Sequence, residues 1–215
     1  MSANFLNAID ELKQKSYLQI FTIYLRYLIG GAFVIAAFGM GKVSGSANLI
    51  HSLDKPIGEL EPLQQFFRVM TESGLYWKFI GWTQIAAGAL LITQRFAKLG
   101  AMIFFGLILN IFIITIAYHF QGTPVITGLM LLANLYLLLW DTRSFLFLIK
   151  DSYTITAIPL KIIDRSFWAW IGIIMIISVV VIMISHLNIF YALGIPFAEG
   201  LLGFVIFFWR FNRPL

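Results

Sequence analysis

The sequence predicts an all-α integral membrane protein, and two features of its composition carry this prediction. Of its 215 residues, 60% are hydrophobic and only 12% are charged, whereas soluble domains carry about 25% charged residues. The hydrophobic residues are gathered in runs close to the roughly 20 residues that a helix needs to cross a bilayer. We therefore expect a polytopic membrane protein with a four-helix bundle and two additional C-terminal transmembrane helices.

Composition also excludes several kinds of chemistry. The chain has no cysteine, so it has no disulfides, thiol catalysis or cysteine-ligated metal centres of its own. Its three histidines include no i,i+4 pair, and we expect no metal site. The net charge of +5 is placed on turns that flank the apolar runs, so we expect a lipid bilayer and no nucleic acid as partner. No nucleophile–base pair is recognisable, and catalytic residues remain unassigned.

The predicted elements follow one another in a simple order. Residues 1–16 are polar and mildly amphipathic, which favours a short helix on the membrane surface, and they show no cleaved signal peptide. Six runs are predicted to cross the membrane: 17–40, 75–93, 97–118, 125–140, 167–185 and 189–209. The resulting domains are the interfacial helix 1–16, the four-helix bundle 17–140, an interfacial connection 141–166 and the helix pair 167–215.

Two further features belong to this predicted arrangement. The polar loop 43–74 is predicted to carry a short amphipathic helix over 60–70. The last span contains Gly194 and Pro196, and we expect it to be broken there.

The distribution of basic residues predicts the topology. Ten lie on the side of the N-terminus: Lys13, Lys15, Arg95, Lys98, Arg143, Lys150, Lys161, Arg165, Arg210 and Arg213. Four lie on the other side: Lys42, Lys55, Arg68 and Lys78. Because cytoplasmic loops carry an excess of Lys and Arg, we expect both termini to be cytoplasmic.

Polar residues inside the predicted spans indicate a candidate ligand site. Each of the first four predicted spans contributes one polar residue at an overlapping depth in the membrane: Arg26, Gln84, Asn110 and Asn134. They predict a pocket among these spans, with Trp82 and Tyr136 as aromatic walls. The alternative is that they form interhelical hydrogen bonds that fix the packing of the bundle.

Two local patterns add detail to this site. Gly81 and Gly88 flank Gln84 on one helix face, which is typical of a surface for another helix. Asp141 is a possible counter-charge for Arg26, because a charge inside a membrane is costly without one.

A second group of candidates is predicted at the outer face. It comprises Lys42, His119, His186 and Glu199. Glu199 follows Pro196 and is expected at the start of a helix, where the dipole favours an acid. The alternative is that all four are solvated ends of spans.

Several motifs resemble one family. They are Arg26-x3-Gly30, Gly39-Met40-Gly41-Lys42, Gly81-x2-Gln84-x3-Gly88-Ala89-Leu90-Leu91 and the basic turn from Arg95 to Gly100. Over residues 20–140 the chain resembles the DoxX-like group of small bacterial membrane proteins, in which many relatives have Glu at the position of Gln84. The resemblance implies a multi-pass protein of the bacterial inner membrane, with Arg26, Lys42 and Gln84 as site residues and a quinone as a possible cofactor.

Three functions remain open at this stage. The first is a redox-associated subunit, an oxidoreductase component that binds a quinone- or lipid-like molecule. The second is a non-catalytic assembly protein that holds a membrane or extracytoplasmic partner through its loop 43–74. The third is a small-molecule transporter, for which broken helices in corresponding halves are the best sequence sign.

Overall fold

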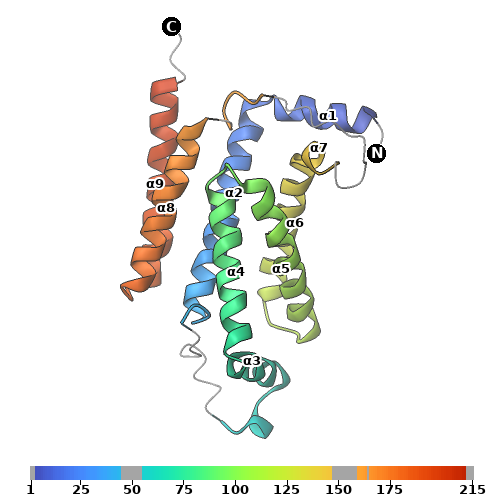
Figure 1. Ribbon diagram of the computed structural model, residues 1–215, viewed down its shortest axis with the longest axis vertical. Coiled ribbons are helices and arrows are strands. Elements are labelled where there is room, and N and C mark those ends of the chain that lie inside the picture. The colour runs from blue at the N-terminus through green and yellow to red at the C-terminus, as the bar shows by residue number, and fades with distance from the viewer. Residues whose placement is uncertain (1–2, 45–54, 147–158, 164, 212–215) are drawn as a thin grey trace.

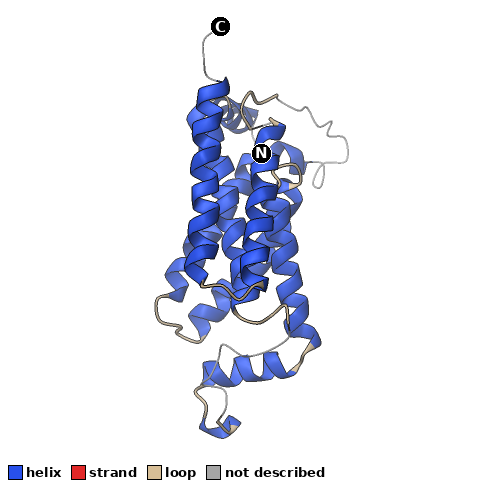
Figure 2. Cartoon of the chain, turned by 90° about the vertical axis from the view of Figure 1, so that its left-hand side faces the viewer, coloured by secondary structure: helices blue, strands red, loops and turns tan. Residues whose placement is uncertain are grey.

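The computed structural model describes residues 3–44, 55–146, 159–163 and 165–211. Within these ranges the protein is built from helices and short turns (Figures 1 and 2). Parts of the loop 43–74 and of the connection 141–166, and the topology residues Lys150 and Arg213, lie outside the described residues.

The centre of the molecule is the predicted four-helix bundle. It consists of α2 (Ser16–Gly39), α4 (Leu75–Ile92), α5 (Ala97–Ala117) and α6 (Thr123–Trp140). Helix α2 packs on α4, α4 on α5, and α5 on α6, while α6 makes a smaller contact back to α2. The helix bounds agree with the predicted spans to within two residues, because long apolar runs with clear breaks at their ends define helices well.

Glycines bring α2 and α4 into close contact. A Cβ atom on Gly88 would lie 2.5 Å from the carbonyl oxygen of Gly30, and one on Gly81 would lie 2.6 Å from the Cβ of Lys42. The small-residue face that carries Gln84 therefore packs against α2, as predicted, and not against lipid. Small residues favour such close packing because they let two backbones approach.

The C-terminal helices form a pair beside the bundle. Helix α8 (Ser166–Ile184) packs on α2 and α4, and α9 (Ile189–Phe211) packs mainly on α8 (Figure 1). Tyr27 of α2 donates a hydrogen bond to the carbonyl oxygen of Trp168, and Tyr24 donates one to that of Gly200. These bonds hold the pair against the bundle.

The prediction that the last span is broken is wrong. Helix α9 continues through Pro196, because a proline removes one backbone hydrogen bond and transmembrane helices tolerate that loss when neighbours compensate. Glu199 consequently lies in the middle of α9 and not at its start. Its Oε1 accepts a hydrogen bond from Ser178 of α8.

Among the residues that the structure describes, five helices are long and apolar enough to cross a membrane: α2, α5, α6, α8 and α9. Helix α4 is as long as α6 but does not meet the same hydropathy requirement, because Lys78 and Gln84 lower its mean hydropathy. It nevertheless lies between α2 and α5 in the bundle. The structure thus supports a multi-pass protein, with five of the six predicted spans recognisable by length and composition alone.

Short helices cover both ends of the bundle (Figure 1). Helix α1 (Ala3–Lys13) and the single turn α7 (Thr142–Phe145) lie at the end where both termini are found. A 3-10 turn (Ile57–Glu59) and α3 (Pro62–Glu72) lie at the opposite end. We call these the basic end and the loop end. The predicted helices over 1–16 and 60–70 correspond to α1 and α3.

Candidate functional site

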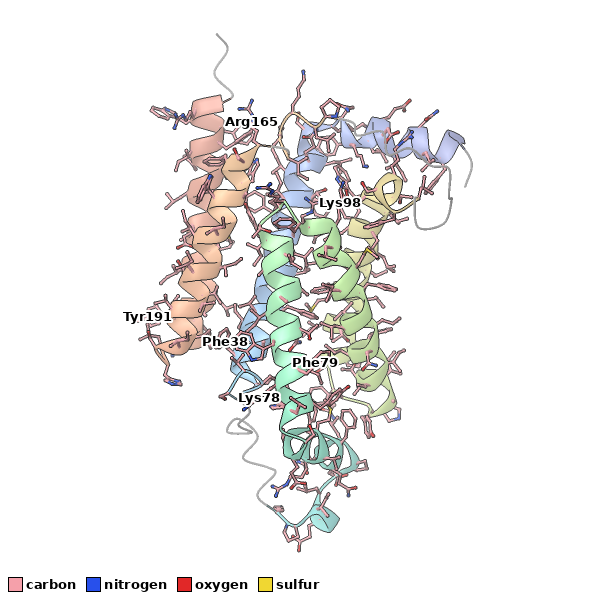
Figure 3. The ribbon with its side chains drawn as sticks, in the orientation of Figure 1. Phe38, Lys78, Phe79, Lys98, Arg165 and Tyr191 are labelled. Carbon is pink, nitrogen blue, oxygen red and sulfur yellow. The ribbon has the colours of Figure 1, made fainter. Side chains whose placement is uncertain are left out.

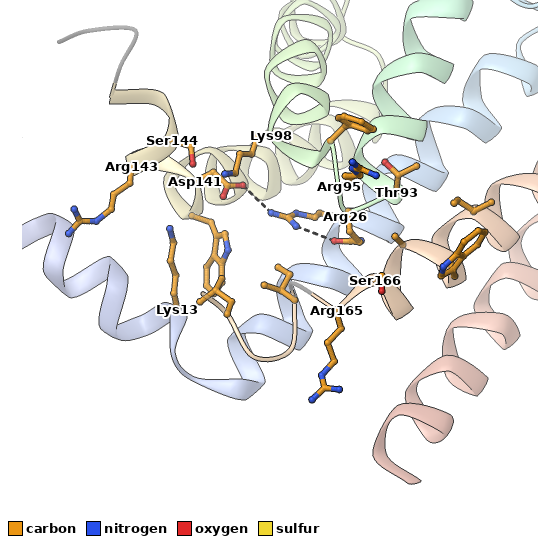
Figure 4. A pocket seen from close by; sticks show the side chains of 18 residues that line it. Lys13, Arg26, Thr93, Arg95, Lys98, Asp141, Arg143, Ser144, Arg165 and Ser166 are labelled. Atoms are coloured by element: carbon orange, nitrogen blue, oxygen red, sulfur yellow. Dashed lines mark hydrogen bonds and ion pairs between the residues drawn. The ribbon is translucent and has the colours of Figure 1, made fainter. Parts of the chain in front are cut away.

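A cavity of about 800 Å³ opens at the basic end, between the four-helix bundle and α8 (Figure 4). We call it the basic-end pocket. Its lining comes from α1, α2, the α4–α5 turn, the end of α6 with α7, the segment before α8, and α8 itself. The lining residues are Lys13, Arg26, Thr93, Gln94, Arg95, Phe96, Lys98, Trp140, Asp141, Arg143, Ser144, Leu160, Ile163, Arg165, Ser166, Ala169, Trp170 and Ile173.

The basic-end pocket is strongly cationic. Six Lys and Arg residues belong to its lining, and Asp141 is the one acid among the described lining residues; the guanidinium of Arg165 is directed to the carbonyl oxygen of Lys161 and the ring of Phe207. Helices α5 and α8 also begin at the pocket, at Ala97 and Ser166. The unpaired N–H groups at the start of a helix favour an anion, so the helix ends add to the effect of the side chains. Figure 3 shows Lys98 and Arg165 at this end of the molecule and Lys78 at the other.

The lining contributed by α8 and the segment before it is mostly apolar, apart from Arg165 and Ser166. Leu160, Ile163, Ala169 and Ile173 contribute aliphatic surface, and Trp170 of α8 is 65% exposed. Tryptophan is enriched where a membrane protein passes from hydrocarbon to water. The pocket therefore combines cationic residues with an apolar wall on the side of α8.

Arg26 lies at the inner side of this pocket and is 5% exposed. Its Nη2 donates to Asp141 Oδ2 at 3.0 Å, and its Nη1 donates to Gln94 Oε1 at 3.1 Å (Figure 4). Asp141 is thus the counter-charge of Arg26, as predicted. The Nε of Arg26 is buried and has no hydrogen-bond partner among the described residues.

Helix α1 closes the pocket from the side. Arg143 forms an ion pair with Asp10 and a hydrogen bond with Asn7, which connects α7 to α1. Lys13 is 8% exposed, and its ammonium lies over the ring of Trp140 at 6.0 Å. Burial lowers the pKa of Lys13, while the nearby carboxylates of Asp141 and Asp10 act in the opposite direction.

The other residues predicted for the ligand site do not join Arg26 in one chamber. Gln84 is 2% exposed and accepts a hydrogen bond from the Lys42 ammonium at 2.9 Å. Asn134 is fully buried and donates to the carbonyl oxygen of Ala101 at 3.1 Å. Both amides thus form bonds between segments of the bundle, which is what the packing alternative predicts for them.

The remaining three residues of that group lie apart as well. Asn110 is exposed on α5, Trp82 is 57% exposed on α4, and the hydroxyl of Tyr136 lies 2.9 Å from that of Thr22. Ile108, two residues before Asn110, is buried in the core. Because successive residues turn by about 100° around a helix axis, Asn110 points to the opposite side.

The predicted outer-face residues are also separate from one another. His119 and His186 lie two residues after the ends of α5 and α8, each with a positive φ just beyond the last turn of the helix. Glu199 lies in mid-helix, as described above. Lys42 alone of this group is enclosed: it is 5% exposed, and its ammonium lies 5.3 Å from the centre of the Trp77 ring.

Lys42 gives a first testable prediction. It follows α2 and lies outside the helices identified as spans, and burial lowers its pKa to about 8. Between this value and the ordinary one of 10.5, the unfolded chain binds more protons, so stability increases with pH. We expect a gain of up to about 3 kcal/mol between pH 8 and pH 10.5. Thermal unfolding in detergent across this range measures it, and equal pH slopes for wild type and Lys42→Met would contradict it.

Sequence reasoning missed most residues of the basic-end pocket. Arg95 and Lys98 were recognised as topology signals and as part of the basic turn in the family resemblance, Arg165 as a topology signal, and Gln94 was not singled out. Their shared feature in the sequence is a position at the end of a span on the basic side. That signal indicates a membrane interface but does not show that the side chains surround one cavity.

No family model, curated protein or solved structure matches this chain. The resemblance to DoxX-like proteins therefore stays a prediction. The class that the described fold defines is a polytopic helical membrane protein with a cationic pocket at one end of its bundle.

Proposed function

We propose that this protein binds an amphiphile with an anionic head group in the basic-end pocket. The observation that carries this proposal is one cavity lined by six Lys and Arg residues and by an apolar wall on the side of α8. Charge-assisted hydrogen bonds from Arg and Lys to phosphate or carboxylate are among the strongest in proteins. The apolar wall offers a matching surface for the chain of the amphiphile.

The position of the pocket supports a membrane-borne ligand. It lies at the ends of α6 and α8, both of which are apolar enough to cross a bilayer, so a lipid would reach it from the side with its head group at the right height. The excess of Lys and Arg at this end favours the cytoplasmic leaflet. We therefore propose that the ligand comes from that leaflet.

This proposal keeps only the lipid-like part of the earlier expectation. A quinone head group is neutral and gains less from several cations than an anion does. No observed feature favours a redox subunit, an assembly protein or a transporter, and these functions remain predictions.

Neutralising the wall of the pocket tests the proposal. We expect the double variant Arg95→Gln/Lys98→Gln to lose anionic lipid about 100-fold, because each lost charge-assisted hydrogen bond contributes about 1.5–3 kcal/mol. The measurement is native mass spectrometry of the purified protein with phosphatidylglycerol and phosphatidylcholine of equal chain length.

The matched control is Lys15→Gln/Lys161→Gln. It removes the same charge at the same end of the molecule from two exposed side chains outside the pocket lining. Equal lipid retention by the two double variants would show that general surface charge, and not the pocket, attracts the lipid.

A further inference from the structure

The charge balance inside the basic-end pocket indicates the kind of head group, on the assumption that the proposed function holds. Two of its cations are paired with acids, Arg26 with Asp141 and Arg143 with Asp10, and the guanidinium of Arg165 is directed to groups outside the cavity lining. Lys13, Arg95 and Lys98 form no ion pair with an acid among the described residues. A head group with one negative charge would leave two of these three cations unmatched.

Lys13 makes this imbalance costly. The residue is 8% exposed, and its ammonium is placed over the Trp140 ring and forms no ion pair with a carboxylate among the described residues. Burying a charge is unfavourable unless it is paired and hydrogen-bonded. The described residues therefore leave a buried cation that an external anion would stabilise.

Arg26 is held in place at the inner side of the cavity by the protein itself. Two of its nitrogens are occupied by Asp141 and Gln94, while its Nε is buried and unpartnered. Buried donors are hydrogen-bonded in the great majority of cases. Because this Nε has almost no accessible surface, a ligand in the cavity would meet the rest of the Arg26 side chain and its charge, not this donor.

We infer that the head group is a phosphate monoester or a pyrophosphate, which carries at least two negative charges on one compact group. Its several oxygens would match Lys13, Arg95 and Lys98 together, and the start of α5 or α8 would provide further N–H donors. A phosphodiester head group has one charge and fewer free oxygens. The apolar wall on the α8 side favours a phosphate borne on a lipid over the free anion.

The test compares two lipids with identical acyl chains whose phosphates differ in this respect. Phosphatidic acid is a phosphomonoester and phosphatidylglycerol a phosphodiester, and both are titrated with identical acyl chains against the full-length protein in zwitterionic detergent at pH 8. We expect phosphatidic acid to bind at least about ten-fold more tightly. We expect this preference to be reduced in Lys98→Gln and in Arg95→Gln, and to be kept in Lys15→Gln.

The free anion distinguishes the source of the phosphate. Inorganic pyrophosphate is expected to displace phosphatidic acid only at much higher concentration, because it gains nothing from the apolar wall. If it binds as tightly as phosphatidic acid, the phosphate chemistry is supported and the ligand is a soluble phosphate, which overturns the amphiphile of the proposed function.

The remaining outcomes separate the two proposals. Equal affinity for phosphatidic acid and phosphatidylglycerol, with both above phosphatidylcholine, would overturn the inference and leave the proposed function in place. Equal affinity for all three lipids, with no binding of pyrophosphate, would overturn both. The comparison of lipids on the wild-type protein requires no variant, so it does not depend on how any substitution folds.

Discussion

Replacing Arg26 with methionine is expected to lower the free energy of unfolding in detergent by about 3–5 kcal/mol, because it leaves a buried acid without its counter-charge. Arg26 and Asp141 are 5% and 7% exposed, and their side chains are joined at 3.0 Å. The pair also connects α2 to the end of α6. Denaturation of the purified variant, followed by loss of helical signal, measures the effect.

A surface ion pair supplies the matched control for Arg26. Arg68 and Glu72 form an i,i+4 pair on α3, with side chains that are 38% and 56% exposed. Exposed pairs contribute about 0–1 kcal/mol, so Arg68→Met is expected to change stability little. We expect Asp141→Asn to recover part of the loss when it is combined with Arg26→Met. Equal stability of Arg26→Met and Arg68→Met would show that the buried ion pair contributes no more to stability than the exposed one.

The second large effect is expected at Gly172, where α8 meets the end of α4. A Cβ atom here would overlap the carbonyl oxygen of Ile92, and a backbone atom cannot move aside as the tip of a side chain can. Overpacking of this kind typically costs about 1–3 kcal/mol. We expect Gly172→Ala to reduce thermal stability by about this amount and Gly172→Leu to reduce it further.

The effect of Gly172 extends to the basic-end pocket. Ser166, Ala169 and Trp170 line the pocket from the first turns of α8, so moving α8 away from α4 widens it. We therefore expect Gly172→Ala to weaken the retention of anionic lipid as well as stability. The control is Gly194→Ala on α9, where an added Cβ meets nothing within 4 Å. Loss of stability in the control alone would contradict this account of the α4–α8 contact.

The helical architecture was predictable because it depends on local properties of the chain. Apolar runs with polar or glycine-containing ends placed α2 and α8 within one residue of their observed bounds. The face formed by Gly81 and Gly88 was predictable for the same reason, since residues separated by seven positions lie on one side of a helix. The pairing of Arg26 with Asp141 followed from the cost of a charge inside a membrane.

The candidate site was less predictable, because the depth of a residue in the membrane does not determine the direction in which its side chain points from the helix axis. Asn110 was placed in the same layer as Arg26, yet it is exposed on the other side of α5. Glu199 was assigned to a helix start, and the continuity of α9 through Pro196 placed it in mid-helix. In both cases the direction or extent of a helix depended on its neighbours.

The sequence alone determined that this chain forms apolar helices with its basic residues concentrated at one end, because hydrophobicity and charge are properties of each segment. Only the tertiary structure decided that Lys13, Arg26 and Lys98, from three different helices, surround one cavity. That arrangement depends on how closely α8 packs against α2 and α4, which is set by contacts between residues far apart in the chain, such as Gly172 and Ile92.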